Sequence, residues 1–519
     1  MLEHFGRMFR SPVGDPHRSC PVKTEENGIP KSNVPSSSNT SGDMEIDNSD
    51  AVLQKISTLY ADRVMNDICL VVAGSEYPAH RLILCASSEV FQVMLMNPEW
   101  SESQESRVAL QEPAACASIF GDFLRYFYTG RIHINHLTVM PVLLLADKYN
   151  VKDLVKLCID YMCVHIAHAA AKNQLVTWLQ YTLACGRDQV AQACQNFVKW
   201  NFELVADTPD FCNFEAEVLA SLLQQNDLVV HNEMALYNCV VKWLEHQHER
   251  LASLDKDFEV QMEQLVIEVM QHVRFPMMSP RQLAELLLSP LTKTYKEFFV
   301  ERMAIGMSFH SGQKERIEEV LRQPGGRLQF TPRLYTADTW STLLSVENFP
   351  QLPPYHTRTL VFSSRSSLAE HAGEHTCEWI VDLYPKGVWF RKFYLIVWQG
   401  TVEVPESVLR TVRLSVMCKD PSPAPDARVK VGVLIRGIRD GVEHVMRVIE
   451  RNHRFCQDDK VLNFDDLLSF DELNSSPGSG SNGCSPYLVG IQRDILKVHI
   501  VIAPLSDLCS TTSPPFSAK

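Results

Sequence analysis

The chain has 519 residues, of which 45% are hydrophobic and 21% are charged, so it is long enough for about three domains with buried cores. Its 49 Lys and Arg against 62 Asp and Glu give a formal net charge of -13. This balance argues against nucleic acid as the main partner, because phosphate backbones need a dense basic surface. The longest apolar run, Val139–Ala146, is far shorter than the roughly 18 residues of a membrane-spanning helix, so no membrane partner is expected.

Cysteine usage favours a reducing compartment. The chain has 15 cysteines, an odd number, and none of them forms a Cys-x-x-Cys pair. Zinc ribbons, RING domains and thioredoxin-like sites usually need that spacing. The first residues, Met1–Val13, are too polar for a secretory leader. We therefore expect reduced thiols and a location in the cytoplasm or the nucleus.

The N-terminal third contains a run of short helices and strands. Residues 1–50 are rich in Ser, Pro, Asn and Gly and are expected to be disordered, because they offer little apolar surface to bury. A helix is predicted over Ala51–Met65 from its apolar spacing. The elements expected next are strands at Asp67–Val72 and Tyr77–Ala79, helices at His80–Ala86 and around Phe91–Leu95, a strand at Val108–Leu110, and helices at Ile119–Thr129, Thr138–Tyr149 and Val151–His165.

Two local signals sharpen these boundaries. Ser87 or Ser88 is placed to cap the helix that carries Phe91. Gly130 is placed to end the aromatic helix in the left-handed conformation.

The middle of the chain is predicted to be almost wholly helical. Apolar residues keep helical spacing from about Ala167 to Ser308, and the connections are short, which is typical of a stack of helical hairpins. Gln313–Gln323 is charged and is also expected to be helical. Pro324-Gly325-Gly326 then interrupts the chain.

After this break the pattern changes to short β-branched and aromatic runs. Turn residues such as Pro385-Lys386-Gly387 and Asp440-Gly441 separate them. Seven such runs predict an antiparallel β-sandwich; they are Thr359–Phe362, Glu378–Leu383, Trp389–Val397, Val412–Met417, Val429–Ile435, Glu443–Ile449 and Ile495–Ile502.

Three sets of motifs resemble known domains. Asn66–Gly130 resembles a BTB/POZ domain through Asp67–Val72, Tyr77–Leu84, Ser87–Phe91, Met94-Leu95 and Phe123–Gly130. The following region resembles a BACK domain through Asn232–Tyr237, Val240–Leu244 and Val273–Leu283. Trp379–Gly387 is similar to the Trp-strand-Pro-x-Gly turn of TRAF/MATH-type sandwiches.

The resemblance implies a multidomain α+β protein. Its parts would be a BTB/POZ α/β domain over 51–165, an all-α BACK domain over 166–308, a linker over 309–335, a TRAF/MATH-like antiparallel sandwich over 336–507 and a disordered tail over 508–519. BTB–BACK proteins of this kind dimerise and dock on a cullin-3 ubiquitin-ligase scaffold. The expected function is therefore a non-catalytic adaptor that presents a protein substrate through its C-terminal domain, while the RING and E2 partners transfer ubiquitin.

The resemblance also implies a cullin-binding surface. In cullin-3-binding BTB domains, a hydrophobic residue, any residue and a Glu follow the helix of the Ser-x-x-Phe motif, and Trp100-Ser101-Glu102 stands at that place. An aromatic anchor beside an orienting carboxylate suits such a contact, although Trp100 could instead pack on its own domain. Phe91 and Met94 are added to the site as residues that are mostly core and could reach its edge.

A dimer interface is expected at the start of the BTB domain. Leu53, Ile56 and Tyr60 share one face of the predicted first helix, and an isologous interface needs such an apolar face. Asp67 and Arg81 match the acidic and basic residues of the BTB central pocket. We expect them to order the fold and the dimer contact through a charge-assisted bond, with corepressor binding in the groove as the alternative.

The sequence does not locate a substrate groove or a catalytic site. Trp379, Trp389 and Trp398 alternate with β-branched residues and are expected in the sandwich core. Gly478-x-Gly480-x-x-Gly483 lies in a Ser/Gly loop without the strand and helix of a dinucleotide site. His371 and His375 flank a glycine and favour a solvated loop over a metal site. We therefore expect no enzyme activity, no cofactor and no metal.

Two other functions remain open. The chain could be a scaffold or transcriptional co-regulator that binds partner peptides without cullin, although no zinc finger or basic region is present to reach DNA. It could also be a secreted BTB–BACK glycoprotein, for which Asn39 and Asn474 supply Asn-x-Ser/Thr sequons.

Overall fold

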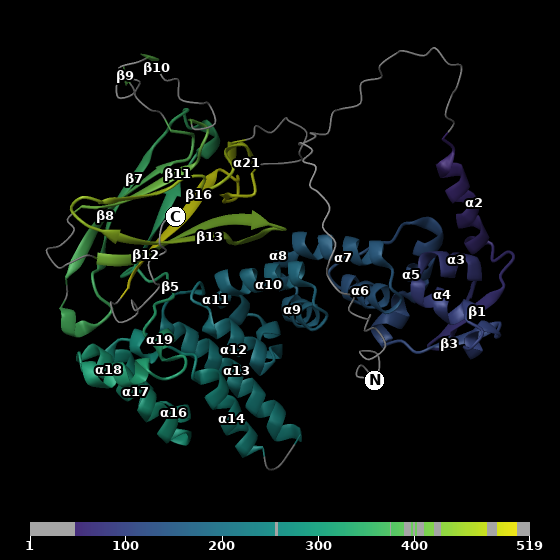
Figure 1. The fold of residues 1–519 in the computed structure, drawn as a ribbon, viewed down its shortest axis with the longest axis horizontal. Coiled ribbons are helices and arrows are strands. Elements are labelled where there is room, and N and C mark those ends of the chain that lie inside the picture. The colour runs from purple at the N-terminus through teal and green to yellow at the C-terminus, as the bar shows by residue number, and fades with distance from the viewer. Residues whose placement is uncertain are drawn as a thin grey trace, which may run out of the picture. The chain divides into compact units, whose positions relative to one another are not determined.

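A computed structural model describes residues 47–254, 258–373, 375–388, 396–397, 400–401, 409–419, 427–474 and 485–505. Helix α2 (Ser49–Ala61) comes first, and none of its residues is buried. The elements up to residue 164 are β1 (Ile68–Val72), β2 (Ser75–Ala79), α3 (Arg81–Ser87), α4 (Glu89–Met96), η1 (Ser101–Ser103), β3 (Arg107–Leu110), α5 (Ala114–Thr129), α6 (Val139–Lys148) and α7 (Lys152–Val164) (Figure 1).

A three-stranded sheet organises this first part. Its strand order is β2-β1-β3, with β1 antiparallel to β2 and parallel to β3. Ala73 and Gly74 form the two-residue turn between β1 and β2, and both have positive φ, 48° and 81°. This is the conformation that fits the twist of a tight hairpin. The buried residues of β1 alternate along the strand, so one face of the sheet meets the helices.

Both predicted local signals are present. The hydroxyl of Ser88 accepts a hydrogen bond from the backbone N–H of Phe91 at 3.1 Å and so caps α4. Gly130 ends α5 with φ 63° and donates its N–H to the carbonyl of Tyr126. A glycine adopts this left-handed conformation without steric cost.

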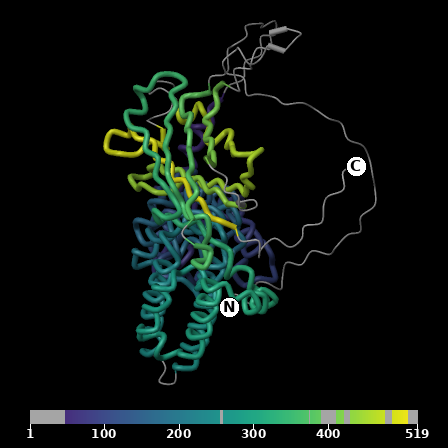
Figure 2. Tube along the Cα trace, turned by 90° about the vertical axis from the view of Figure 1, so that its left-hand side faces the viewer, coloured from purple at the N-terminus to yellow at the C-terminus, as the bar shows by residue number. Residues whose placement is uncertain are grey.

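The helical middle continues the same core. Its elements are α8 (Ile166–Ala171), α9 (Leu175–Ala184), α10 (Asp188–Trp200), α11 (Phe202–Ala206), η2 (Pro209–Asn213), α12 (Ala216–Gln224), β4 (Val229–Val230), α13 (Glu233–Leu254), α14 (Glu259–Met270), η3 (Phe275–Met277), α15 (Pro280–Leu286), α16 (Pro290–Thr294) and α17 (Lys296–His310). Helix α13 packs against α14 as a long hairpin (Figures 1 and 2). Buried residues from Ile68 to Tyr335 form one continuous apolar cluster.

The linker predicted over 309–335 is instead a folded connector. It contains α18 (Lys314–Leu321), α19 (Gly326–Gln329) and β5 (Leu334–Tyr335). Ile317, Val320 and Phe330 are buried in a small core with Phe309 at the end of α17. The helix expected over Gln313–Gln323 is present as α18, and its buried Ile317 and Val320 give the segment a place in the fold.

The C-terminal part is a sandwich of two antiparallel sheets, as predicted. The first sheet has the order β14-β11-β8-β7, and the second has β13-β12-β16-β15 with β6 beside β16. Strand β16 (yellow) lies among the green strands of the second sheet in Figure 2. The strands are β6 (Ser341–Val346), β7 (Arg358–Arg365), β8 (Thr376–Tyr384), β9 (Ile396–Val397), β10 (Gly400–Thr401), β11 (Arg413–Cys418), β12 (Ala427–Arg439), β13 (Val442–Phe455), β14 (Val461–Phe464), β15 (Leu488–Val489) and β16 (Ile495–Pro504).

Residues from both sheets fill the sandwich core. Trp379 of β8 is 1% exposed and donates its indole N–H to the hydroxyl of Ser364 at 2.9 Å. It also packs against Phe455 of β13, with ring centroids 5.1 Å apart. The core prediction for Trp379 is thus confirmed, whereas Trp389 and Trp398 lie outside the described residues.

The longest hairpin is closed by a predicted turn. Asp440 and Gly441 join β12 to β13 with φ values of 52° and 80°. Strands β6 and β14 were not predicted, because each has only two large apolar residues facing the core. Such short strands give a weak alternating pattern.

A buried charge cluster joins the helical part to the sandwich. Glu233 at the start of α13 and Arg333 just before β5 both have fully buried side chains. The Glu233 carboxylate accepts from Arg333 Nε at 3.1 Å, from the Tyr335 hydroxyl at 2.6 Å and from the Arg274 backbone N–H at 2.8 Å. Beside it, β4 and β5 pair in parallel.

The charges of this cluster compensate one another. Burial alone would raise the pKa of Glu233, but Arg333, Arg274 and the hydrogen bonds hold this pKa below its ordinary value of 4.5. Arg333 also donates to the carbonyls of Gln225 and His272, each at 2.8 Å. A buried charge is tolerated only when it is paired in this way.

Replacing Glu233 by alanine is expected to lower the free energy of unfolding by about 3–5 kcal/mol, because it leaves a buried guanidinium without its partner. Chemical denaturation measures the change. Glu249→Ala, an exposed residue of the same helix, is the control and should change stability little. A loss no larger than that of the control would contradict a structural role for the cluster.

The ion pair between Glu233 and Arg333 also makes the stability of the fold depend on pH in acid solution. The folded-state pKa of Glu233 lies below 4.5. The ionised carboxylate therefore contributes to folding stability at neutral pH, and this contribution is lost as the pH falls through the folded-state pKa.

Candidate functional site

Helix α4 has apolar residues on two opposite faces. Phe91, Met94 and Leu95 are buried in the core. Val93 and Met96 point outward and are 53% and 65% exposed. A helix with a second, solvent-facing apolar face marks a surface for a partner.

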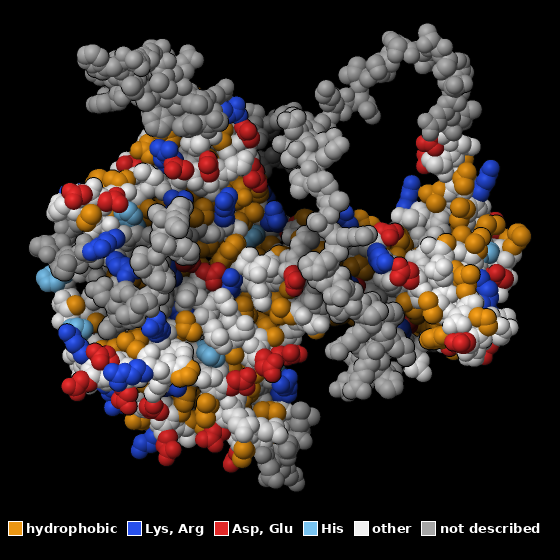
Figure 3. Space-filling view, in the orientation of Figure 1, with side chains coloured by type: hydrophobic (Ala, Val, Ile, Leu, Met, Phe, Trp, Pro, Cys, Tyr) orange, Lys and Arg blue, Asp and Glu red, His pale blue; other side chains and the backbone are white. Residues whose placement is uncertain are grey.

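Other exposed apolar residues extend this face. Trp100, in the loop after α4, is 44% exposed, and Leu82 on the neighbouring α3 is 78% exposed. We call Leu82, Val93, Met96 and Trp100 the α3–α4 surface. Figure 3 shows hydrophobic side chains gathered over this part of the molecule, at the right of the view.

The structure corrects two predicted members of the cullin site. Phe91 is fully buried and stacks on Tyr149 with ring centroids 4.5 Å apart, and Met94 is only 9% exposed. The Ser88 hydroxyl also donates to the carbonyl of Tyr149 at 2.5 Å, which fixes this face of α4 toward α6. Phe91 and Met94 therefore hold the helix in place rather than contact a partner.

The predicted pair Trp100 and Glu102 lies at the surface in an ordered turn. The backbone N–H of Trp100 donates to the carbonyl of Asn97 at 3.1 Å. The carbonyl of Trp100 accepts from the backbone N–H of Ser103 at 3.1 Å and from its hydroxyl at 2.8 Å. The Glu102 carboxylate accepts from the Ser101 hydroxyl at 2.9 Å and is part-exposed. A fixed backbone lowers the entropy that a contact through Trp100 would cost.

Arg81 holds this turn against the domain. Its guanidinium donates to the carbonyl of Leu95 at 3.2 Å and also to the carbonyls of Glu102 and Glu105. The expected side-chain bond between Asp67 and Arg81 is not what the structure contains. The Asp67 carboxylate accepts instead from the backbone N–H of Arg81 at 2.8 Å, at the N-terminus of α3, where a negative charge is stabilised by the helix.

The predicted dimer residues differ in their surroundings. Leu53 is 41% exposed on α2, and its neighbour Val52 is 51% exposed. Ile56 and Tyr60 pack partly against the core of their own domain. Tyr60 stacks on Tyr128 with centroids 4.7 Å apart. Among the residues predicted from α2, Leu53 is the one most available to a second copy.

The sandwich is fixed on the helical part by polar bonds as well as packing. The buried Asn201 amide donates to the carbonyl of Val445 at 3.1 Å and accepts from its N–H at 2.7 Å, so it pairs with β13 as a strand would. Val229, Leu334 and Leu434 form a small shared core beside it. Buried Lys430 of β12 donates to the carbonyls of Asn226 and Pro332.

The weaker signals for a metal site, a dinucleotide site, a glycan or a membrane span gain no support from the described residues. Among the described residues, no group of three His, Cys, Asp or Glu could hold a metal ion, and His371 and His375 are exposed. Gly478, Gly480, Gly483 and Asn39 lie outside the described residues. The described part of the chain also has no helix with the length and apolar character that crossing a membrane requires.

In the sequon at Asn474, the side-chain nitrogen that a glycan would modify already makes hydrogen bonds within the fold. The Asn474 amide nitrogen donates to the carbonyl of Pro385 at 3.2 Å and to that of Phe470 at 3.0 Å. N-glycosylation joins the sugar to this nitrogen, so a glycan there would displace both hydrogen bonds.

Sequence reasoning missed Leu82, Val93 and Met96 as surface residues. The signal was present, because α4 reads EVFQVMLM and is apolar around most of its circumference. A single sequence does not say which of two apolar faces meets the core. The function of Arg81 in holding the turn was also missed, since it depends on backbone carbonyls that carry no sequence signature.

Comparisons with known proteins identify three domains. The BTB/POZ domain matches residues 57–166, the BACK domain ("BTB And C-terminal Kelch") matches 175–288, and the BTBD17 TRAF domain matches 330–506. These matches confirm the resemblance, and the TRAF match begins within the segment predicted as a linker.

Relatives match part of the chain at modest identity. The chain is similar to BTB/POZ domain-containing protein 17 of Xenopus laevis, 27% identical over 60% of this chain and 61% of that protein. It is also similar to galectin-3-binding protein of Mus musculus, 27% identical over 59% of this chain and 51% of that protein. The solved BTB domain of human gigaxonin is 24% identical over 23% of this chain and 97% of its own, with a TM-score of 0.19.

Arg81→Met is expected to loosen the Trp100 turn while leaving the tryptophan in the sequence. A hydrogen bond from a charged donor contributes about 1.5–3 kcal/mol, so amide hydrogen exchange over residues 97–106 should speed up by about tenfold or more. Arg125→Met is the control, because the Arg125 guanidinium forms an exposed ion pair with Asp122 on α5, outside the Trp100 turn. Unchanged exchange over 97–106 in Arg81→Met would rule out this function of Arg81.

Proposed function

We propose that this BTB–BACK domain protein, which also contains a BTBD17-type TRAF domain, is a dimeric substrate adaptor of a cullin-3 ubiquitin ligase. The BTB domain binds the scaffold and a second copy of the chain, and the TRAF domain binds the protein to be modified. The observation that carries the proposal is the exposed apolar α3–α4 surface with Glu102 at its border.

The α3–α4 surface has the composition of a protein interface. It joins an aromatic anchor, Trp100, to aliphatic side chains on α3 and α4, with polar residues of the turn at its rim. Interfaces of this kind obtain most of their binding energy from a few such anchors. The cullin would then lie against Val93, Met96 and Trp100, and Glu102 would orient it.

The TRAF domain offers open strand edges for a substrate. Strands β7 and β14 end the first sheet among the described residues. Val361 in the middle of β7 is 51% exposed. An extended peptide can add to such an edge through backbone hydrogen bonds, with side-chain pockets supplying specificity.

The fixed contact between the helical part and the sandwich suits this function. Asn201, Lys430 and the Glu233 cluster prevent the sandwich from swinging on a free linker. A bound substrate would be held at a defined distance from the scaffold, which raises its local concentration at the loaded E2.

The scaffold hypothesis without cullin and the secreted glycoprotein remain alternatives. Against the secreted glycoprotein, the Asn474 amide is engaged within the fold.

The double substitution Trp100→Ala with Glu102→Ala is expected to lower recovery of cullin-3 by at least about tenfold, since loss of an anchor typically costs 2 kcal/mol or more. Pull-down of cullin-3 by the full chain measures this. Neither side chain is in the core, so the fold should persist, and thermal unfolding checks it.

The control for this experiment is Ile491→Ala, which truncates a fully exposed apolar side chain of the TRAF domain. It should leave cullin-3 recovery unchanged. Equal recovery with the double variant and with the wild type would reject this site, and binding of a corepressor peptide without cullin would favour the scaffold alternative.

Val52→Asp with Leu53→Asp is expected to weaken the homodimer by at least about tenfold, because a carboxylate buried in an apolar interface costs several kcal/mol. Sedimentation of the full chain over a concentration series measures the dissociation constant. Gln54→Asp places a single carboxylate on the next residue, beside the apolar face, and should have a smaller effect than either Val52→Asp or Leu53→Asp alone. A wild-type chain that is monomeric at all concentrations would exclude dimerisation.

A further inference from the structure

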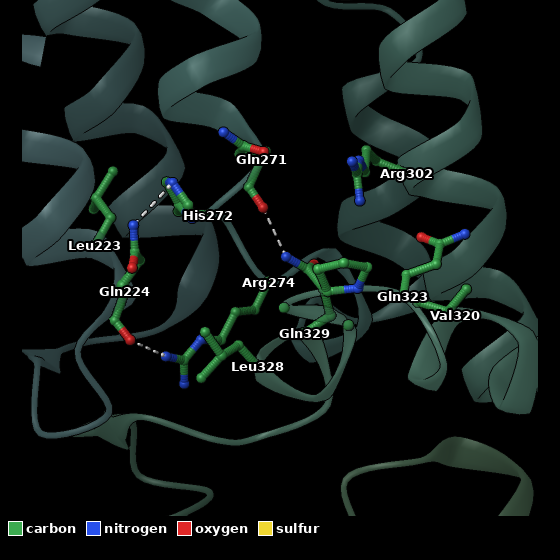
Figure 4. Close-up of a pocket in the computed structure, with 13 residues that line it drawn as sticks. Leu223, Gln224, Gln271, His272, Arg274, Arg302, Val320, Gln323, Leu328 and Gln329 are labelled. Carbon is green, nitrogen blue, oxygen red and sulfur yellow. Dashed lines mark hydrogen bonds between the residues drawn. The ribbon is translucent and has the colours of Figure 1, made fainter. Parts of the chain in front are cut away.

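A cavity lies between the helical part and the connector, away from the α3–α4 surface. Its volume is about 180 Å³, and it is bounded by the end of α14, by α17 and by the turn that follows α18. Figure 4 shows Arg302 and Gln323 on one side of this cavity, with Gln271 and His272 across from them. Such a volume holds much more than one water molecule.

The described lining of the cavity contains two arginines and no acidic side chain. His272, Arg274 and Arg302 line it, and none of its described lining residues is Asp or Glu. Burial lowers the pKa of His272, and the positive charges of Arg333, Arg274 and Arg302 lower it further. The nearby carboxylate of Glu233 is already shared by Arg333, Tyr335 and the Arg274 backbone.

Two of the lining side chains are held by other bonds. The Arg274 guanidinium donates to the carbonyls of Thr331, Gln224 and Gln225 and to the side chain of Asn226. The Gln329 amide donates to the carbonyl of Gln271 at 2.7 Å. These bonds make the wall of the cavity rigid.

Arg302 differs from these residues. Its guanidinium lies over the Phe298 ring, 5.3 Å from the centroid. Its buried Nε has no hydrogen-bond partner among the residues that the structure describes. A buried donor without a partner is costly and is usually satisfied by a ligand, an ion or water.

The turn opposite Arg302, at Gly325 and Gly326, packs tightly against the end of α18. A Cβ at Gly326 would lie 1.9 Å from the carbonyl oxygen of Val320, so only glycine permits this approach. Gly325 before it has φ 75°, which other residues rarely adopt. The glycine pair thus keeps Gln323 and the turn packed at the rim of the cavity.

We propose that this cavity binds a small oxyanionic ligand, with a phosphate or carboxylate group held by Arg302 and the surrounding amides. The planar guanidinium is the side chain best suited to such a group. The positive charge of Arg302, with the Arg274 guanidinium also in the lining, supplies the long-range attraction. This ligand site is separate from the proposed scaffold and substrate surfaces, so it stands or falls independently of them.

The principal test is Gln323→Glu in the full chain. Gln323 is exposed at the rim, so this isosteric change should leave the fold intact while placing a carboxylate beside Arg302. Calorimetric titration with inorganic phosphate, and separately with acetate, is compared with chloride at matched ionic strength. We expect saturable binding of at least one oxyanion by the wild type and at least about tenfold weaker binding by the variant, the loss equivalent to about 1.4 kcal/mol.

Two further variants complete the test. Gln261→Glu adds the same charge to an exposed site on α14 outside the cavity and should bind as the wild type does. Arg302→Gln removes the proposed anchor and should lose binding to the same extent as Gln323→Glu. Phosphate binding without acetate binding would identify a phosphate ligand, and the reverse a carboxylate. Binding of neither by the wild type, or equal binding by wild type and Gln323→Glu, would overturn the proposal.

Discussion

The carboxylate of Glu233 receives hydrogen bonds from chain segments that lie far apart in the sequence. Arg333 and Tyr335 reach it from the start of the C-terminal domain, and the backbone of Arg274 reaches it from the helical part. Because the Glu233 side chain is fully buried, its charge depends on these hydrogen bonds for stabilisation. The relative position of the helical part and the sandwich is therefore fixed by an electrostatic condition. Apolar packing alone, which tolerates sliding, would specify it less sharply.

The exposed α3–α4 surface of the BTB domain also follows from what is buried beneath it. The aromatic residue of helix α4, Phe91, is buried and stacks on Tyr149. Because this face of the helix meets the core, Val93 and Met96 on the opposite face are exposed to solvent. Arg81 then ties the following turn to the domain through three carbonyls. An exposed apolar patch is costly for a lone chain, because it invites aggregation. Its presence on a rigid support is better explained by a partner than by folding.

Much of this architecture could be predicted from the sequence, because it depends on local signals. Alternation of apolar residues predicted β8 and β12, Ser88 and Gly130 predicted helix ends, and Asp440-Gly441 predicted a tight turn. The domain resemblance was confirmed by the matches to BTB, BACK and TRAF domains. The candidate site was predicted less well. The placement of Phe91 inside, and of Arg81 on carbonyls rather than on Asp67, depends on contacts between distant residues, which periodicity does not encode. Helix α18 was predicted, but its packing into a core with Phe309 and Phe330 was not, because that packing also depends on contacts between distant residues.

The folded connector has a consequence for how an adaptor of this form could act. A flexible linker spreads a bound substrate over a volume, and its effective concentration at the scaffold falls as the linker lengthens. Here β5 pairs with β4, Asn201 pairs with β13, and Lys430 bonds to the carbonyls of Asn226 and Pro332. A substrate on the TRAF domain would keep one orientation with respect to the helical part. Selectivity would then include which of its lysines can reach the transferring enzyme, because orientation as well as proximity determines reaction within a complex. A substitution that loosens the connector would then alter which substrate lysines receive ubiquitin, even though it touches neither binding surface.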